Sequence, residues 1–302
     1  MTSPDDWPRT DAEVAPFVRS LGLDGVVDLH VHHLPPRLQE AVWRYFDGLT
    51  DPPWPIVYRD DEPTRLATLR ELGVLRHTAL AYGHKPGVSV WCNEHTLGLA
   101  DAQAQVIPTF TFYPEPEAPA YVADAIARGG RVAKVHLQVG RFHATDPQLD
   151  EVWPQLAAAR IPVVLHASGV YGVDGGHEYC GPDAVRELLE RHPDVTVVVA
   201  HLGMPDGHGF LTLAEGTPEL WLDTTMTLLD PPYGPPYPAE LLPRLAALHD
   251  RVIFGSDFPS IPLPYVAGIR GLAQLELDAT GLRAVLHDNA RRLLGDGAPP
   301  IG

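Results

Sequence analysis

The run Val27-Asp28-Leu29-His30-Val31-His32-His33 decides how the rest of this sequence is interpreted. Because successive side chains on a β-strand point to opposite faces, we expect His30 and His32 to project the same way. Two neighbouring imidazoles can hold one divalent metal ion. Three later apolar runs also end in residues that commonly ligate metals, namely His166, His201 and Asp257.

Strand-like runs alternate with helical patterns along the whole chain. Strands are predicted at residues 26–33, 77–82, 106–113, 132–139, 162–167, 195–201, 220–225 and 252–258, and helices at 63–72, 93–104, 119–128, 150–160, 182–191, 239–248, 264–275 and 280–294. Eight such alternations predict a (β/α)8 TIM barrel. A doubly wound open sheet is the alternative, although no Gly-x-Gly-x-x-Gly follows the first strand. We expect an N-terminal extension at 1–22 and a single barrel domain at 23–302.

Composition restricts the function classes. The 302 residues include 22 Lys plus Arg and 39 Asp plus Glu, a formal charge of −17. Such a surface repels nucleic acid and anionic membranes, so we expect neither as a partner. The polar first residues carry no signal-peptide core, no apolar run is long enough to span a bilayer, and the two cysteines form no Cys-x-x-Cys pair. These features favour a cytoplasmic protein, although the two cysteines could still pair in an exported one.

The ligand-type residues fall where a barrel enzyme needs them. In a (β/α)8 barrel the active site is built at the C-terminal ends of the strands. His30, His32, His166, His201 and Asp257 each lie at that end of a predicted strand. Imidazoles with a carboxylate suit Zn²⁺ and leave a position for water or substrate, and Mn²⁺, Fe²⁺ or Co²⁺ can replace it.

Five segments in this order resemble the amidohydrolase superfamily, specifically the amidohydrolase-2 branch that also contains the aminocarboxymuconate semialdehyde decarboxylase-like enzymes. The segments are Asp28-Leu-His-Val-His32, Val-Val-Leu-His166-Ala, Ala200-His-Leu-Gly203, Phe254-Gly-Ser-Asp-Phe-Pro259 and Asn289-Ala-Arg-Arg-Leu-Leu294. They span nearly the whole chain. The resemblance implies that His30, His32, His166 and Asp257 ligate one metal and that His201 acts beside it as an acid, base or polarising group. Homodimers are frequent in this branch.

Lys134 lies inside the predicted fourth strand, where a charge is costly unless it is paired or functional. We expect Lys134, His136 and Gln138 to share one strand face. Lys134 and His136 are therefore candidate substrate-binding residues. In two-metal relatives a carboxylated lysine at this position bridges the ions, and Lys134 with His166 and His201 could do so here.

Three functions follow from the resemblance. The leading hypothesis is hydrolysis of a small amide, lactone or cyclic metabolite by a metal-activated water, with Asp257 moving the proton. The alternative is non-oxidative decarboxylation of an aromatic or unsaturated acid at the same site. A non-catalytic metal-bearing barrel that binds a ligand is the third. Around the metal, Asp223 is a candidate partner of a histidine, Asp28 could orient the site or pair with Lys134, and Trp54, Tyr82, Trp91 and Tyr171 could line the pocket.

Overall fold

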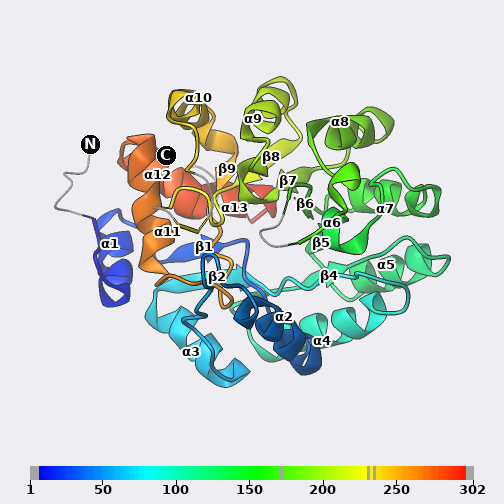
Figure 1. Ribbon diagram of the computed structural model, residues 1–302, viewed down its shortest axis with the longest axis horizontal. Helices are drawn as coiled ribbons and strands as arrows, with labels where there is room; N and C mark the ends of the chain where they lie inside the picture. The colour runs from blue at the N-terminus through cyan, green and yellow to red at the C-terminus, as the bar shows by residue number, and fades with distance from the viewer. Residues whose placement is uncertain (1–6, 170–172, 230–231, 234–235, 297–302) are drawn as a thin grey trace.

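The computed structural model describes residues 7–169, 173–229, 232–233 and 236–296. Its strands are all parallel to their neighbours and form two sheets (Figure 1). The first sheet contains β1 (Val26–Asp28), β2 (Val74–Thr78) and β3 (Val106–Ile107); the second contains β4 (Thr109–Thr111), β5 (Val132–His136), β6 (Val163–His166), β7 (Val197–Val199), β8 (Leu220–Asp223) and β9 (Val252–Ile253).

Short links join the two sheets into a (β/α)8 barrel, which confirms the predicted fold. Strands β3 and β4 form one run interrupted at Pro108, whose ring nitrogen has no hydrogen to donate to a ladder. On the other side, Leu29 N donates to the Phe254 carbonyl at 3.2 Å and Asp257 N donates to the His30 carbonyl at 2.8 Å. These bonds bring the segments that follow β1 and β9 side by side.

Helices surround the strands (Figure 1). They are α1 (Val14–Ser20), α2 (Pro36–Asp47), α3 (Glu62–Glu71), α4 (Ser89–Ala102), α5 (Ala118–Ala127), α6 (Leu137–Gly140), α7 (Val152–Ala158), α8 (Pro182–Arg191), α9 (Gly207–Gly216), α10 (Leu242–Ala247), α11 (Val266–Gly271), α12 (Ala279–Arg283) and α13 (Asn289–Leu293). The predicted bounds of α8 are confirmed. Helices α2, α6 and α9 were not predicted.

The predicted strands are too long at the ends that carry the ligand-type residues. Strand β5 ends at His136, and Gln138 lies on α6, so the expectation that Gln138 shares a strand face with Lys134 is wrong. Strand β7 ends at Val199, and His201 follows in a turn. The apolar sequence runs continue beyond the hydrogen-bonded strands because the loops at this end of the barrel are also buried.

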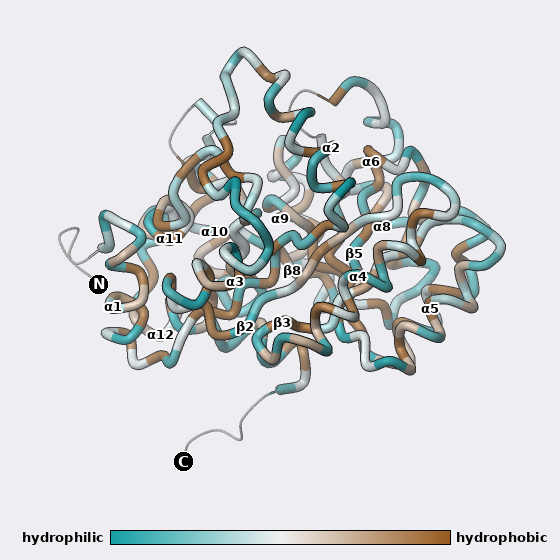
Figure 2. Tube along the Cα trace, turned by 90° about the horizontal axis from the view of Figure 1, so that it is seen from below, coloured by the Kyte–Doolittle hydropathy of each residue, from teal (hydrophilic) through white to brown (hydrophobic). Residues whose placement is uncertain are grey.

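Barrel strands and the inner faces of the helices form the core, with Phe110, Trp153 and Phe254 fully buried between them. From α1, Phe17 and Val18 join the same core, so residues preceding the barrel pack against it. Figure 2 shows α2 and α6 at the same end of the barrel. None of the helices in the described ranges is long and apolar enough to cross a membrane.

Candidate metal centre

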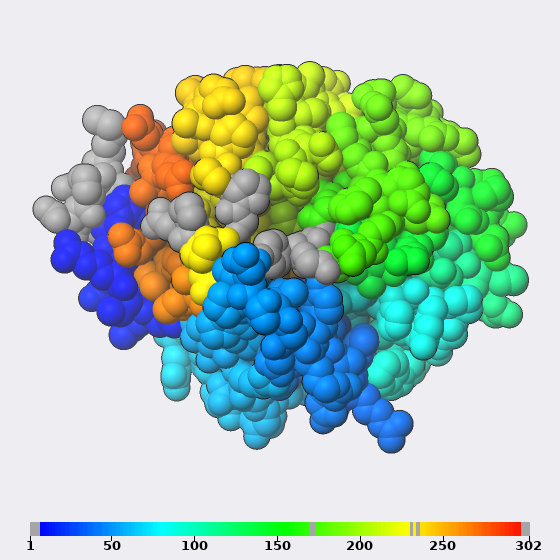
Figure 3. Space-filling view, viewed as in Figure 1, coloured from blue at the N-terminus to red at the C-terminus, as the bar shows by residue number. Residues whose placement is uncertain are grey.

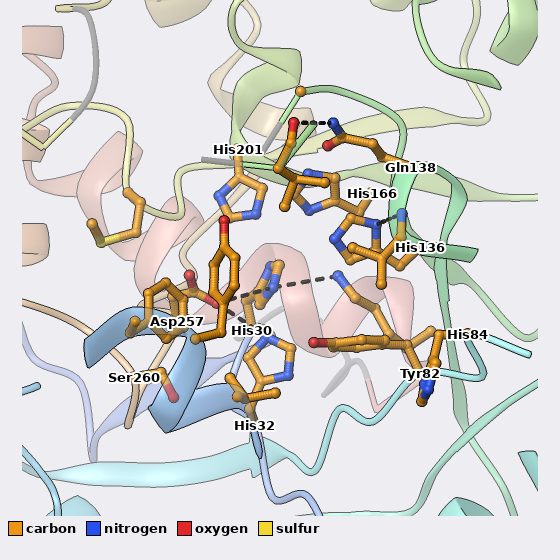
Figure 4. Close-up of a pocket in the computed structure, with 18 of the residues that line it drawn as sticks. His30, His32, Tyr82, His84, His136, Gln138, His166, His201, Asp257 and Ser260 are labelled. Atoms are coloured by element: carbon orange, nitrogen blue, oxygen red, sulfur yellow. Dashed lines mark hydrogen bonds and ion pairs between the residues drawn. The ribbon is translucent and has the colours of Figure 1, made fainter. Parts of the chain in front are cut away.

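Three predicted ligands converge where β1 and β9 end. Asp257 Oδ1 lies 3.1 Å from His32 Nε2 and 3.5 Å from His30 Nε2. One ligand atom from each of the three residues lies within 4.8 Å of the other two. In Figure 4 both imidazoles and the carboxylate point into the same cavity. The sequence therefore predicted this cluster, although β1 itself ends at Asp28.

Both histidines are oriented through Nδ1. His30 Nδ1 donates to Asp223 Oδ2 at 2.8 Å, and His32 Nδ1 donates to the Leu80 carbonyl at 3.0 Å. Because carboxylates and carbonyls only accept, this network assigns the proton to Nδ1 and a lone pair to Nε2 in each ring. A carboxylate or carbonyl behind the ring is typical of histidines that bind metals. The expected pairing of Asp223 with a histidine is confirmed.

The spacing of these donors suits a small divalent ion. Two ligands on a tetrahedral Zn²⁺, with bonds of about 2.0 Å, lie about 3.3 Å apart. The observed separations from Asp257 Oδ1 to the two Nε2 atoms, 3.1 and 3.5 Å, bracket that value. An imidazole lone pair facing a carboxylate oxygen at this distance is repulsive, and a cation between them removes the repulsion. The residues therefore fit a metal ion of the kind that the resemblance implies.

The electrostatics of the cluster keep its donors in the forms that bind metals. Burial and then the charge of Lys134 lower the pKa of His30 to about 3, so its ring is neutral at pH 7. Burial alone would raise the pKa of Asp257, yet that pKa stays below its ordinary value, and a cation held among the three donors would favour the same ionised form. A neutral imidazole and an ionised carboxylate are the ligating states.

His166 lies beside this cluster but outside the three-residue set. Its ring stacks on His136 with centroids 3.9 Å apart and meets the His201 ring at 4.6 Å. Its Nε2 is buried and makes no hydrogen bond among the described residues. A buried ring nitrogen that makes no hydrogen bond and lies beside metal-binding donors is available to bind a metal ion. The ligand role of His166 stays a prediction.

His201 occupies a turn rather than a strand end. Its backbone has φ 58° and ψ 35°, a left-handed conformation that costs energy for a residue other than glycine. Asp223 Oδ1 accepts the His201 backbone N–H at 2.9 Å, and the His201 ring Nδ1 donates to the Thr225 carbonyl at 3.0 Å. Burial lowers the pKa of His201. The ring is therefore neutral, with its Nε2 lone pair available to the cavity.

Lys134 is 1% exposed, and its Nζ lies 3.4 Å from His30 Nε2. Burial lowers the pKa of Lys134 to about 8. Within the described ranges no carboxylate lies within 4 Å of this ammonium. Asp28, the partner considered for it, instead accepts from His30 N, Ser256 N and the Tyr265 hydroxyl, so that pairing is wrong.

The cluster forms the floor of a cavity of about 720 Å³. Trp54 and Tyr82 line this cavity as expected, whereas Trp91 is an exposed side chain on α4 and Tyr171 lies outside the described residues. Sequence reasoning missed the contribution of α2. The sequence did contain a signal for this helix. Pro36 suits a first helical turn, and Leu38, Val42 and Tyr45 follow it at helical spacing.

Together the fold and the cluster define a TIM-barrel protein with a candidate metal centre at the C-terminal ends of its strands. The chain belongs to the amidohydrolase family, whose profile matches residues 27–295. That match and the barrel confirm the resemblance noted in the sequence. A comparison with curated proteins found no match.

Several solved structures share the fold. An uncharacterised TIM-barrel protein from Bordetella bronchiseptica is 21% identical, with a TM-score of 0.66 over 90% of this chain and 98% of that one. The 5-carboxyvanillate decarboxylase of Sphingomonas paucimobilis is 16% identical (TM-score 0.63; 90% and 99%). A probable 2-pyrone-4,6-dicarboxylic acid hydrolase from Acinetobacter baumannii is 15% identical (TM-score 0.60; 90% and 99%). At these identities the likeness establishes the fold and does not choose between reactions.

Proposed function

We propose that this protein is a metal-dependent hydrolase that acts on a small amide, lactone or cyclic metabolite. The observation that carries the proposal is the convergence of His30, His32 and Asp257, with ligand atoms within 4.8 Å of one another, on the floor of a large cavity. Membership of the amidohydrolase family supports it. His166 would complete the ligand set, with Zn²⁺ as the expected ion and Mn²⁺, Fe²⁺ or Co²⁺ as substitutes.

A divalent ion held there would polarise a substrate carbonyl and lower the pKa of water to about 7. Asp257, ionised at neutral pH, would accept the proton of the attacking water and return it to the leaving group. His201 presents an unprotonated Nε2 to the cavity, which favours proton acceptance over donation. Lys134 would bind an anionic group of the substrate close to His30.

Non-oxidative decarboxylation is the second candidate, and Lys134 is the observation that favours it. A buried ammonium 3.4 Å from His30 Nε2, with no carboxylate within 4 Å among the described residues, is suited to hold a substrate carboxylate. The carbon–carbon bond would break with its electron pair left on the substrate carbon. A positioned acid would then protonate that carbon as CO2 leaves. The same residues serve both reactions, so only the products separate them.

Metal analysis and a product assay test both proposals. We expect the purified or Zn²⁺-reconstituted protein to hold about one equivalent of metal and to hydrolyse members of a panel of amides and lactones. Asp257→Asn is expected to retain some metal and lose turnover, whereas Asp61→Asn, which changes a carboxylate that caps α3 outside the cavity, is expected to keep both. CO2 release from aromatic or unsaturated acids without hydrolysis would favour decarboxylation. A protein that takes up neither Zn²⁺ nor Mn²⁺ would contradict both reactions.

A further inference from the structure

Helix α2 has an inverted arrangement of polar and apolar side chains. Its buried residue is the polar Gln39, which is 3% exposed. Its apolar side chains Leu38, Ala41, Val42 and Tyr45 line the cavity instead. Their spacing places them along one stripe of the helix. Figure 3 shows the segment that contains α2, in blue, near the centre of the face where the strands end.

Hydrogen bonds on the buried side fix this orientation. Gln39 accepts from Arg65 at 2.9 Å and donates to Ser260 Oγ at 3.5 Å. From the next turn, Trp43 Nε1 donates to the same hydroxyl at 3.2 Å. The helix is therefore held against the loop that follows β9, and rotating it to bury the apolar stripe would break three hydrogen bonds. The stripe stays turned toward the cavity.

Aromatic rings extend the stripe beyond α2. Phe46 stacks on Trp54 with centroids 5.3 Å apart, and Trp54 meets Tyr233 edge to face at 5.5 Å. Trp54 Nε1 donates to the Ser260 carbonyl at 2.8 Å, so the ring keeps an apolar face for the cavity. We use the term α2 wall for the cavity-lining residues Leu38, Ala41, Val42, Tyr45, Phe46 and Trp54.

The α2 wall contributes no charged side chain to the described lining of the cavity. The charged residues among the described cavity-lining set are Lys134 and Asp257 at the floor and Arg141 after α6. A ligand carrying a charge against the α2 wall would lose hydration without gaining a partner. An apolar group placed there would instead remove apolar surface from water on both sides of the contact. The cavity volume of about 720 Å³ leaves room for such a group beyond the reacting centre.

We propose that the substrate carries an uncharged apolar body, at least the size of an aromatic ring or a branched alkyl chain, that packs on the α2 wall while its reacting group lies at the metal centre. This inference rests on the proposed function for the position of the reacting group. It makes Leu38 and Val42 specificity-determining residues. By the same argument, a charged group of the substrate would lie at the floor of the cavity rather than against the α2 wall.

A series of hydroxamates tests the proposal, since a hydroxamate head group binds metals and the tail can be varied. Zn²⁺-loaded protein is titrated with acetohydroxamate, butanohydroxamate, hexanohydroxamate and the hydroxamate of adipic acid, which ends in a carboxylate. Each methylene covered by the wall is expected to tighten binding by about fourfold. The adipic compound is expected to lose that gain. Leu38→Asn with Val42→Asn should abolish the dependence on tail length and leave acetohydroxamate binding unchanged.

Glu40→Gln, on the exposed side of α2, is the matched control and should preserve the full dependence on tail length. Equal affinities along the series, or equal gains for the carboxylate-ended tail, would overturn the inference and leave the proposed function standing. If acetohydroxamate binds no better with Zn²⁺ than without it, the proposed function fails instead. A neutral naphthalene dye then decides the inference by itself: its binding should weaken at least tenfold in the double variant, and unchanged binding would overturn it.

Discussion

Asp223→Asn is the sharpest test of how the metal centre is built. Asp223 Oδ1 accepts the backbone N–H groups of His201 at 2.9 Å and Thr225 at 3.1 Å, while Oδ2 accepts His30 Nδ1 at 2.8 Å. The two backbone donors require an oxygen, so an asparagine there must turn its amide nitrogen toward His30. Two N–H donors would then face each other. His30 is expected to move its proton to Nε2, which removes the lone pair from the metal site.

The magnitude follows from the same contacts. Loss of a partner behind a ligating histidine typically weakens metal binding by about 10- to 100-fold, or about 1.4–2.7 kcal/mol. Because the change inverts the tautomer of His30 and also removes the negative charge of a buried carboxylate, we expect Zn²⁺ affinity to fall by about 100-fold. Competition against a chromophoric zinc chelator at pH 7 measures this directly. The near-isosteric side chain should leave the fold intact by circular dichroism.

Asp278→Asn is the matched control, since Asp278 caps α12 by accepting from Gly281 N at 2.8 Å, and asparagine caps helices equally well. It should bind Zn²⁺ as the wild type does. If Asp223→Asn retains wild-type affinity in a folded protein, the assigned tautomer of His30 is wrong and Nε2 does not bind the ion.

Three further changes test other parts of the structure. Lys134→Met removes a buried charge, so it should raise the melting temperature of the metal-free protein. The same change should lower turnover at least tenfold. Unchanged metal content and turnover would rule out a functional role for this lysine. Burial raises the pKa of Asp28 from 3.8 to about 6, so the folded protein holds a proton that the unfolded chain has lost, and stability falls as pH rises through this window. Asp28→Asn should remove this pH dependence. In urea titrations of metal-free protein, the free energy of unfolding of the variant minus that of the wild type should therefore rise by up to about 3 kcal/mol between pH 4 and 7. A difference that stays constant with pH would refute the raised pKa of Asp28. Burial raises the pKa of Cys92 and Cys180 to about 12. A disulfide reagent at pH 8 should therefore label both thiols in urea and neither in the folded protein. Rapid labelling of the folded protein would contradict this prediction.

The strands and most outer helices could be predicted because periodicity is a local property of the sequence. The Val-rich runs before His166 and His201 fit buried parallel strands, and the bounds of α8 follow from Pro182 at its start. Helix α9 escaped prediction because Gly207, Gly209 and Gly216 lower its intrinsic helix propensity. Packing of Phe210 and Leu211 into the core stabilises it instead. That stabilisation comes from residues distant in sequence, which local patterns do not report.

The residue types of the candidate site were predictable from the sequence, but the hydrogen bonds that position those residues were not. A histidine pair and an aspartate after apolar runs predict a metal cluster. The carbonyl of Leu80 behind His32 carries no side-chain signal at all, because any residue supplies the same carbonyl. The apolar wall of α2 was missed for a related reason. In a sequence, an apolar stripe on a helix has the same spacing whether it faces the core or a cavity. In the structure, the burial of the polar Gln39 shows that the apolar stripe of α2 faces the cavity.

Backbone geometry holds Asp257 and His201 in place in the absence of a metal ion. Asp257 has φ 69° and His201 has φ 58°, both in the left-handed region, where a residue other than glycine costs about 1 kcal/mol or more. Each is compensated by a hydrogen bond from its own N–H, to the His30 carbonyl and to Asp223 respectively. The bond from Asp257 N to the His30 carbonyl therefore couples two candidate ligands through the main chain. The barrel thus sets their separation, and a metal ion would find the donors already assembled.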